Sequence, residues 1–146
     1  MAHNLAKSDL ENKIKNAIEN KLDFCYETNF NSTPLYWPKI FKVANYRIEI
    51  VFFCLDSIKK AKERVRIRFE NGGHFVPDNE VEIRYKLGFE NLNKYWKYFD
   101  SINLFETSTY NSTPDHFLTI EENKLILFNY FPQYLEKLIP NFKEIL

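Results

Sequence analysis

The sequence predicts a single α/β domain over residues 1–146, built on a mostly parallel β-sheet with helices on both faces. Short apolar runs alternate along the chain with longer segments whose apolar residues recur at helical spacing. The run RIEIVFFCL, residues 47–55, is apolar on both faces in its second half, which is typical of a central parallel strand. With 146 residues, 45% of them hydrophobic, the chain is long enough to bury one sizeable core.

The first third of the chain predicts two helices, each followed by a strand. Ser8 or Asp9 can cap a helix that runs to about Lys21. An apolar strand of three residues follows at 24–26, and a polar turn separates it from a helix over residues 35–44. The strand at 47–55 comes next.

The middle of the chain predicts a crossover of two helices. Asp56 or Ser57 can cap a helix that reaches about Phe69, and the glycines at 72–73 end it. Pro77 forces an extended residue before it, and Asp78 can start a second helix, which is expected to run to about Phe99.

The last third predicts a third strand, a hairpin and a helix. Residues 102–105 form a short apolar strand, and HFLTI and KLILF are separated by a turn sequence that indicates a β-hairpin. The tail from Phe131 is expected to be helical, with a break near Pro140.

Charge and composition exclude several classes of partner. Twenty Lys and Arg residues balance twenty Asp and Glu residues, so there is no overall positive field for nucleic acid or an anionic membrane. The N-terminus lacks the apolar core of a signal peptide, and the longest uncharged apolar run, residues 50–55, is too short to span a bilayer. We therefore expect a cytoplasmic protein with free cysteines.

Two similar loops follow predicted strands. ETNFNSTP covers residues 27–34 and ETSTYNSTP covers residues 106–114. Ligands of open α/β sheets bind beyond the carboxyl ends of the strands, so the two Glu-Thr pairs could face one crevice. Asn, Ser, Thr and Pro are also good turn formers, and turn chemistry alone is the stronger interpretation of the repeat.

The arginines of RVRIR form a candidate anion site. Arg64 and Arg68 are four residues apart and share one flank of the predicted helix, whereas Arg66 lies on the other flank. Guanidinium groups bind phosphate oxygens in bidentate geometry, so this pair could hold a phosphate. A helix face exposed to water is the alternative, and it is the commoner meaning of such a charge run.

The residues after these arginines have similarly open interpretations. Gly72 and Gly73 suit a helix stop better than a hinge, and His74 has no partner at a recognisable spacing. With glycines only at 72, 73 and 88, the chain contains no G-x-x-x-x-G-K-[ST] phosphate loop. Its three histidines show no zinc-site spacing, and we expect no metal site.

These segments together resemble a known family. RVRIRFENGGHFVP, residues 64–77, with the preceding ETNFNS and the following IRYKLGFENL, is similar to the later part of the zeta toxin-like P-loop kinases. This branch includes UDP-N-acetylglucosamine kinase-like proteins and predicted ABC-type ATPases. The resemblance covers about residues 8 to 108 and implies an incomplete P-loop kinase-like fold, ending here in a β-hairpin plus helix.

The resemblance implies a kinase that uses ATP and Mg²⁺ to phosphorylate a hydroxyl substrate, such as a UDP-amino sugar. It assigns the catalytic contact with the ATP phosphates to Arg64 and Arg68, and further cofactor contacts to His74 and Arg84. It assigns the substrate to the strand-end motif Glu27, Thr28 and Asn29.

Departures from the family pattern affect the substrate and cofactor sites. Ile83 stands where a second arginine is expected, Asn29 replaces a threonine, and Glu-Thr-Ser at 106–108 replaces Asp-Asn-Ser.

The family's P-loop and acidic general base would lie before Met1. The P-loop backbone and its lysine supply much of the positioning and charge neutralisation in phosphoryl transfer. We therefore expect a truncated kinase that is inactive alone. Its candidate partners are a P-loop-bearing chain, an antitoxin and a second copy of itself. One alternative is a non-catalytic relative that binds a nucleotide-sugar or pairs with a complete kinase or its antitoxin, and another is a gene fragment without a function.

Overall fold

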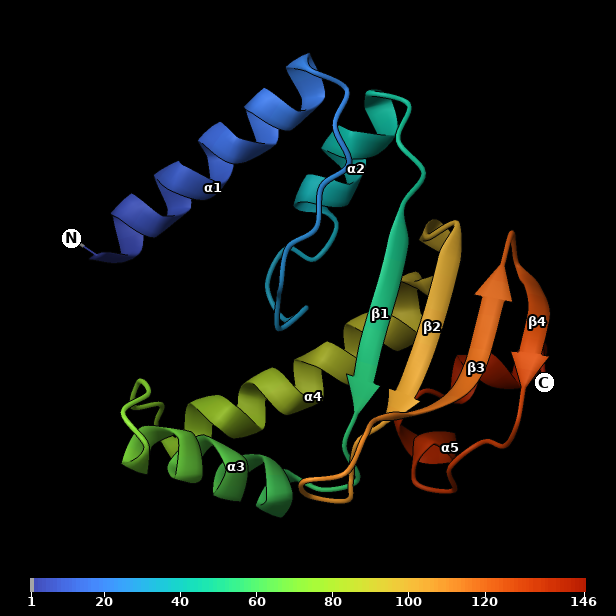
Figure 1. Cartoon of the computed structure of the whole chain (residues 1–146). Coiled ribbons are helices and arrows are strands. Elements are labelled where there is room, and N and C mark those ends of the chain that lie inside the picture. The colour runs from blue at the N-terminus through green and yellow to red at the C-terminus, as the bar shows by residue number, and fades with distance from the viewer. Residues whose placement is uncertain (1) are drawn as a thin grey trace.

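A computed structural model describes residues 2–146, with side chains from Leu5 onward. It is a mixed α/β structure with one open four-stranded sheet of order β1-β2-β3-β4 (Figure 1). The strands are β1 (Glu49–Cys54), β2 (Ser101–Glu106), β3 (Asp115–Glu121) and β4 (Lys124–Phe128). The predicted strands at 47–55 and 102–105 and the predicted hairpin are confirmed.

The sheet is mostly antiparallel, so the prediction of a mostly parallel sheet is wrong. Only β1 and β2 pair in parallel, whereas β2 with β3 and β3 with β4 are antiparallel. The third parallel strand expected at residues 24–26 is absent, because that segment pairs with no other strand. The hairpin therefore supplies half of the strands and sets the character of the sheet.

Two helices precede the sheet. The first, α1 (Ala2–Glu19), begins earlier than the predicted cap, and α2 (Tyr36–Val43) lies where a helix was expected. Ile14 and Ala17, on one side of α1, are buried. The hydroxyl of Tyr46 donates to the carbonyls of Ala17 (3.0 Å) and Leu22 (2.8 Å), which fastens the end of α1 to the chain entering β1.

The crossover between β1 and β2 contains α3 (Ile58–Glu70) and α4 (Asp78–Tyr95), followed by the 3₁₀ turn η1 (Trp96–Tyr98). Ser57 caps α3 as predicted, since its Oγ accepts from the Lys60 N–H. The double glycine is a helix stop: Gly72 adopts φ +92°, and the N–H of Gly73 donates to the Arg68 carbonyl at 2.7 Å.

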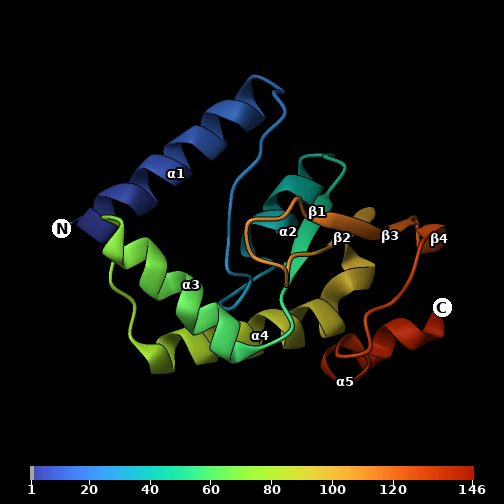
Figure 2. The same ribbon diagram turned by 60° about the horizontal axis from the view of Figure 1, so that its bottom comes forward.

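The core lies on one face of the sheet, between the sheet and α4 with the C-terminal turns (Figure 2). The turns are α5 (Leu135–Leu138) and η2 (Pro140–Glu144), which meet at Pro140, where the sequence predicted a break. The residues sealed in this core include Leu92, Trp96, Ile102, Leu104, Phe117, Leu118, Ile120, Leu135, Ile139 and Phe142.

The opposite face of the sheet is open at β1. Val51 and Phe53 point away from the core and are 53% and 58% exposed. The prediction of helices on both faces is therefore not met over this part of the sheet.

Among residues 2–146, no helix is both long enough and apolar enough to cross a bilayer.

A candidate anion-binding site

The candidate site lies where the two parallel strands end. The N–H and hydroxyl of Thr107, just after β2, both donate to the Cys54 carbonyl at the end of β1, at 2.9 and 2.8 Å. The N–H of Asp56 donates to the Ser108 hydroxyl at 3.0 Å. These bonds hold the two loops side by side at the carboxyl edge of the sheet, where ligands of α/β proteins usually bind.

Glu106 organises this edge. Its carboxylate accepts from the N–H of Ser108 at 2.8 Å, from the Ser108 hydroxyl, and from the Tyr134 hydroxyl at 2.8 Å. Burial raises the pKa of Tyr134, and the nearby Cys54 and Glu106 raise it further. Because both of its oxygens are engaged, we interpret Glu106 as a support for the loops rather than a group open to ligand.

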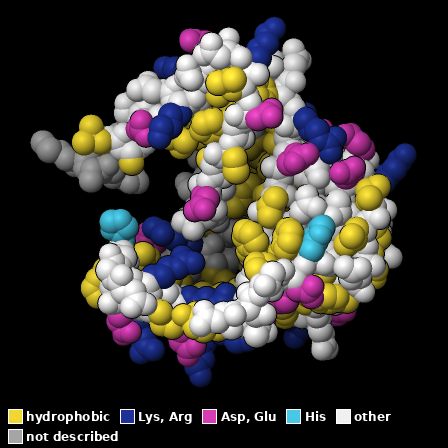
Figure 3. All heavy atoms as spheres, in the orientation of Figure 1, with side chains coloured by type: hydrophobic (Ala, Val, Ile, Leu, Met, Phe, Trp, Pro, Cys, Tyr) yellow, Lys and Arg dark blue, Asp and Glu magenta, His cyan; other side chains and the backbone are white. Residues whose placement is uncertain are grey.

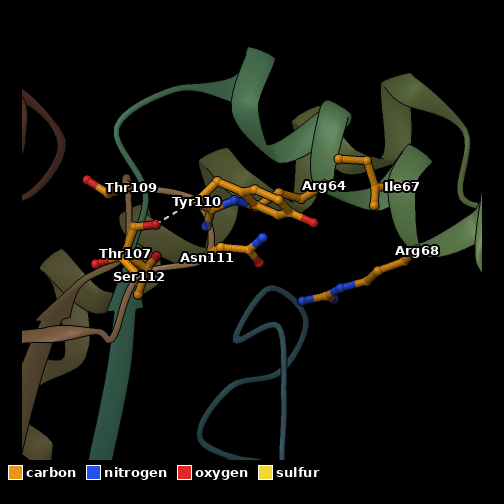
Figure 4. Close-up of a pocket in the computed structure, with 8 residues that line it drawn as sticks. All are labelled: Arg64, Ile67, Arg68, Thr107, Thr109, Tyr110, Asn111 and Ser112. Carbon is orange, nitrogen blue, oxygen red and sulfur yellow. Dashed lines mark hydrogen bonds between the residues drawn. The ribbon is translucent and has the colours of Figure 1, made fainter.

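A cavity of about 240 Å³ opens beside these loops (Figure 4). One wall is α3, and the other is the loop between β2 and β3. Its lining residues are Arg64, Ile67, Arg68, Thr107, Thr109, Tyr110, Asn111 and Ser112. The lining carries two guanidinium groups, three hydroxyl-bearing residues of the Ser/Thr type, a phenol and an amide, with no carboxylate. This donor set suits an anion.

The two arginines sit differently in the cavity. Arg64 is partly buried, donates to the Thr107 carbonyl, and lies 6.0 Å from the centre of the Tyr110 ring. The side chain of Arg68 makes no hydrogen bond or ion pair with any residue from 5 to 146, and it extends from α3 toward the cavity (Figure 4). One guanidinium is therefore fixed and the other is available.

Positive side chains are also concentrated at one place on the molecular surface. Lys and Arg side chains gather around a hollow on the face shown in Figure 3. Arg66, on the other flank of α3, is not among the residues that line this cavity, and it pairs loosely with Glu70 at 3.9 Å. As predicted, Arg64 and Arg68 therefore lie together, and Arg66 lies apart from them.

The other predicted cofactor residues lie outside this cavity. His74 is exposed in the loop between α3 and α4. Arg84, on α4, is paired with Glu80 one turn earlier. Neither residue lines the cavity that Arg64 and Arg68 share.

The predicted substrate residues form a separate loop against α4. Glu27, Thr28 and Asn29 are exposed, and the Thr28 hydroxyl accepts from the N–H of Phe30 at 3.0 Å, as expected for turn chemistry. The Asn91 amide donates to the Phe30 carbonyl at 2.8 Å and holds this loop on the helix.

Gly88 allows the same loop to approach α4. A Cβ at this position would lie 3.2 Å from the Asn29 carbonyl oxygen, tighter than most side-chain contacts. The two Glu-Thr loops are therefore placed on different supports, and only the second of them lines the cavity.

Several lining residues were not singled out by the sequence. Thr109, Tyr110, Asn111 and Ser112 belong to ETSTYNSTP, whose similarity to ETNFNSTP was the signal available. Turn chemistry was the stronger interpretation for both loops. It describes the first loop, but in the second the same polar residues also form a cavity wall.

One buried carboxylate oxygen near the strand ends lacks a hydrogen-bond donor. Asp56 Oδ2 pairs with Lys60 Nζ at 2.7 Å, whereas the buried Oδ1 has no hydrogen-bond partner within residues 5–146. Beside it, the Tyr85 hydroxyl donates to the Leu55 carbonyl at 2.7 Å, and burial, with Asp56 as the next cause, raises the pKa of Tyr85 to about 12. Tyr85 therefore stays protonated and acts as a donor.

In the part of the chain that the structure describes, no group of three or more His, Cys, Asp or Glu side chains is arranged to hold a metal ion. Comparison with models of protein families, with curated proteins and with solved structures found no match to the chain. The fold and the cavity alone show an α/β protein with a cavity, lined in part by two arginines, beside its strand ends.

Proposed function

We propose that the chain is the arginine-bearing part of a zeta toxin-like kinase, in which Arg64 and Arg68 bind the phosphates of ATP. The observation that carries this proposal is the cavity that the two guanidinium groups share beyond the ends of β1 and β2, without a carboxylate in its lining. Phosphoryl transfer depends on positioning and on neutralising the charge of the phosphates, and arginines serve both purposes.

The residues of the lining would contribute to phosphate binding in different ways. Arg64, held by the Thr107 carbonyl and the Tyr110 ring, offers a guanidinium of fixed orientation. Arg68 can turn toward a phosphate without breaking an existing bond. The Thr109 and Ser112 hydroxyls and the Asn111 amide add neutral donors on the opposite wall.

The residues present fit the phosphates of a nucleotide. When bound, ATP would supply the phosphoryl group, and Arg64 and Arg68 would orient and neutralise it. Mg²⁺, the hydroxyl substrate, its binding by Glu27, Thr28 and Asn29, and the cofactor roles of His74 and Arg84 remain predictions from the resemblance.

We expect ATP to bind weakly to these 146 residues, because they contain no P-loop pattern. The missing backbone donors and lysine would come from a partner chain or from another segment. A dissociation constant of about 1 mM corresponds to only ~4 kcal/mol, which two arginines in an open cavity can supply.

The test is a titration of the purified chain with ATP, monitored by NMR chemical shifts. It is carried out on the wild type, Arg68→Ala and Arg66→Ala. We expect millimolar affinity for the wild type and a loss of about tenfold for Arg68→Ala, equivalent to roughly 1.4 kcal/mol. Arg66→Ala is the matched control, since it removes the same charge from the other flank of α3 and should bind ATP as the wild type does.

Two results would overturn the proposal. An equal loss of ATP affinity in both variants would show that ATP binding depends on net charge alone. Micromolar affinity for the wild type would show that the chain holds the triphosphate without the cradle that the proposal assigns elsewhere.

A non-catalytic relative that pairs with a complete kinase or antitoxin would use the same arginines. Mixing the chain with a P-loop-bearing partner distinguishes the two: restored ATP hydrolysis supports the kinase, and binding without turnover supports the relative.

A further inference from the structure

Three aromatic side chains form a stack across the open face of the sheet. Phe53 of β1, Phe105 of β2 and His116 of β3 occupy paired positions on adjacent strands. The rings of Phe105 and His116 are nearly parallel, at 14°, with centres 4.5 Å apart, and the Phe53 ring lies 5.6 Å from that of Phe105. Both separations are typical of favourable aromatic pairs, so the three rings form one continuous stack.

Hydrogen bonds fix the inner end of this stack. His116 Nε2 lies 2.8 Å from Thr119 Oγ1, and the Thr119 hydroxyl donates its own hydrogen to Asn103 Oδ1 at 2.7 Å. Because that hydrogen is already used, Thr119 accepts from His116, which makes Nε2 a protonated nitrogen and sets the orientation of the ring. The protein alone therefore holds the stack in place.

The outer end of the stack is exposed. Phe53 lies on the edge strand β1 and is 58% exposed, whereas Phe105 and His116 are half-buried. Among residues 5–146, Phe105 is the only aromatic neighbour of Phe53, and it lies on the β2 side. The side of the Phe53 ring away from β2 is therefore available to a further planar ring.

The exposed end of the stack adjoins the arginine cavity. Phe53 is followed by Cys54, whose carbonyl accepts from the N–H of Thr107 in the cavity lining at 2.9 Å. Phe105 lies two residues before Thr107, about 7 Å along an extended chain. The arginine-bearing helix α3 lies on the β1 side of the sheet in both ribbon views (Figures 1 and 2). In Figure 3, apolar side chains over the sheet border the hollow around which the Lys and Arg side chains gather.

We infer that Phe53 is the stacking partner of a nucleobase, in a nucleotide whose phosphates occupy the cavity of Arg64 and Arg68. A nucleobase is planar and has a π-face on each side, so it can extend a stack of aromatic rings by one member. The neighbouring guanidinium groups select a ring that is joined to phosphates. This inference rests on the proposed phosphate site and adds recognition of the base to it.

The test compares ATP with tripolyphosphate, which carries the phosphates without the base. Both ligands are titrated into the wild-type chain and into Phe53→Leu, with binding monitored by NMR chemical shifts. We expect the wild type to bind ATP about tenfold more tightly than tripolyphosphate, a usual effect of one stacked base. Phe53→Leu keeps an apolar side chain and removes the ring, so it should lose this preference and bind tripolyphosphate as the wild type does.

A matched control makes the same substitution on the other edge strand. Phe128 of β4 is 49% exposed and belongs to no part of the stack. Phe128→Leu should therefore keep the tenfold preference for ATP. Circular dichroism checks that both variants are folded. Phe53→Trp should also keep the preference, because it retains an aromatic ring at the end of the stack.

Three outcomes overturn the inference while leaving the phosphate site in place. They are equal affinity of the wild type for ATP and tripolyphosphate, an equal loss of preference in Phe53→Leu and Phe128→Leu, and an unchanged preference in Phe53→Leu. Self-association of the wild type that Phe53→Leu abolishes would overturn it as well, since a second copy would then cover the stack.

A different result marks failure of the phosphate site. If neither ATP nor tripolyphosphate binds, the proposed function fails, and adenosine tests the stack separately. We expect saturation transfer from the wild type to the adenine protons, weakened at least about threefold in Phe53→Leu. Absence of this transfer, or equal transfer from both proteins, would overturn the base site independently.

Discussion

Arg64 and Arg68 differ in how firmly each is held, and this difference gives them separate roles. Arg64 is tied to the loop after β2 through the Thr107 carbonyl. A charge-assisted hydrogen bond of this kind stabilises the folded chain as well as orienting the guanidinium. Arg68 has no such tie within the described residues, so we expect its removal to affect the proposed ligand binding and not the stability of the chain.

A comparison of unfolding free energies tests this division. Arg64→Ala should lower the free energy of unfolding by about 1 kcal/mol, because it leaves the partly buried Thr107 carbonyl without its donor. Arg68→Ala should change it by less than about 0.5 kcal/mol. Urea denaturation followed by tryptophan fluorescence measures both. If the two variants lose equal stability, the structural role of Arg64 is wrong.

At the scale of the element, α3 is a helix defined by its two ends. None of its residues is fully buried, and it packs against α4. Ser57 caps the start, and Gly72 in the left-handed conformation ends it. The two ends therefore fix the span of the helix that carries Arg64 and Arg68.

Gly72→Ala is expected to destabilise the chain by about 1 kcal/mol, because an L-residue at φ +92° is strained. Gly72→Asn should cost less, since asparagine tolerates left-handed backbone better than other residues. Thermal unfolding of both variants measures the effect. A Gly72→Ala chain as stable as the wild type would show that this glycine does not set the end of α3.

The ends of α3 and the strands at 49–54 and 101–106 could be predicted because local signals determine them: a serine cap, a glycine stop and continuous apolar runs. The segment at 24–26 has the same apolar character but forms no strand. Pairing depends on a neighbour from elsewhere in the chain, and that information is absent from the local sequence. The cavity wall at 109–112 was missed for a related reason, since turn residues have one composition whether or not they face a ligand.

At the scale of the molecule, one face of the sheet is covered by the core, and the other face is exposed at β1. The core between the sheet and α4 with the C-terminal turns is sealed, whereas β1 leaves its outer edge and the side chains of Val51 and Phe53 uncovered. The arginine cavity lies at the carboxyl end of that same strand pair.

The most direct measurement of the central claim is a residue-by-residue NMR map of the chain titrated with tripolyphosphate. The account predicts that the largest shifts fall on Arg64, Arg68 and the 107–112 loop, and that they decline as salt is added. Shifts concentrated on Arg66 and the outer flank of α3, or spread evenly over the surface lysines, would contradict it.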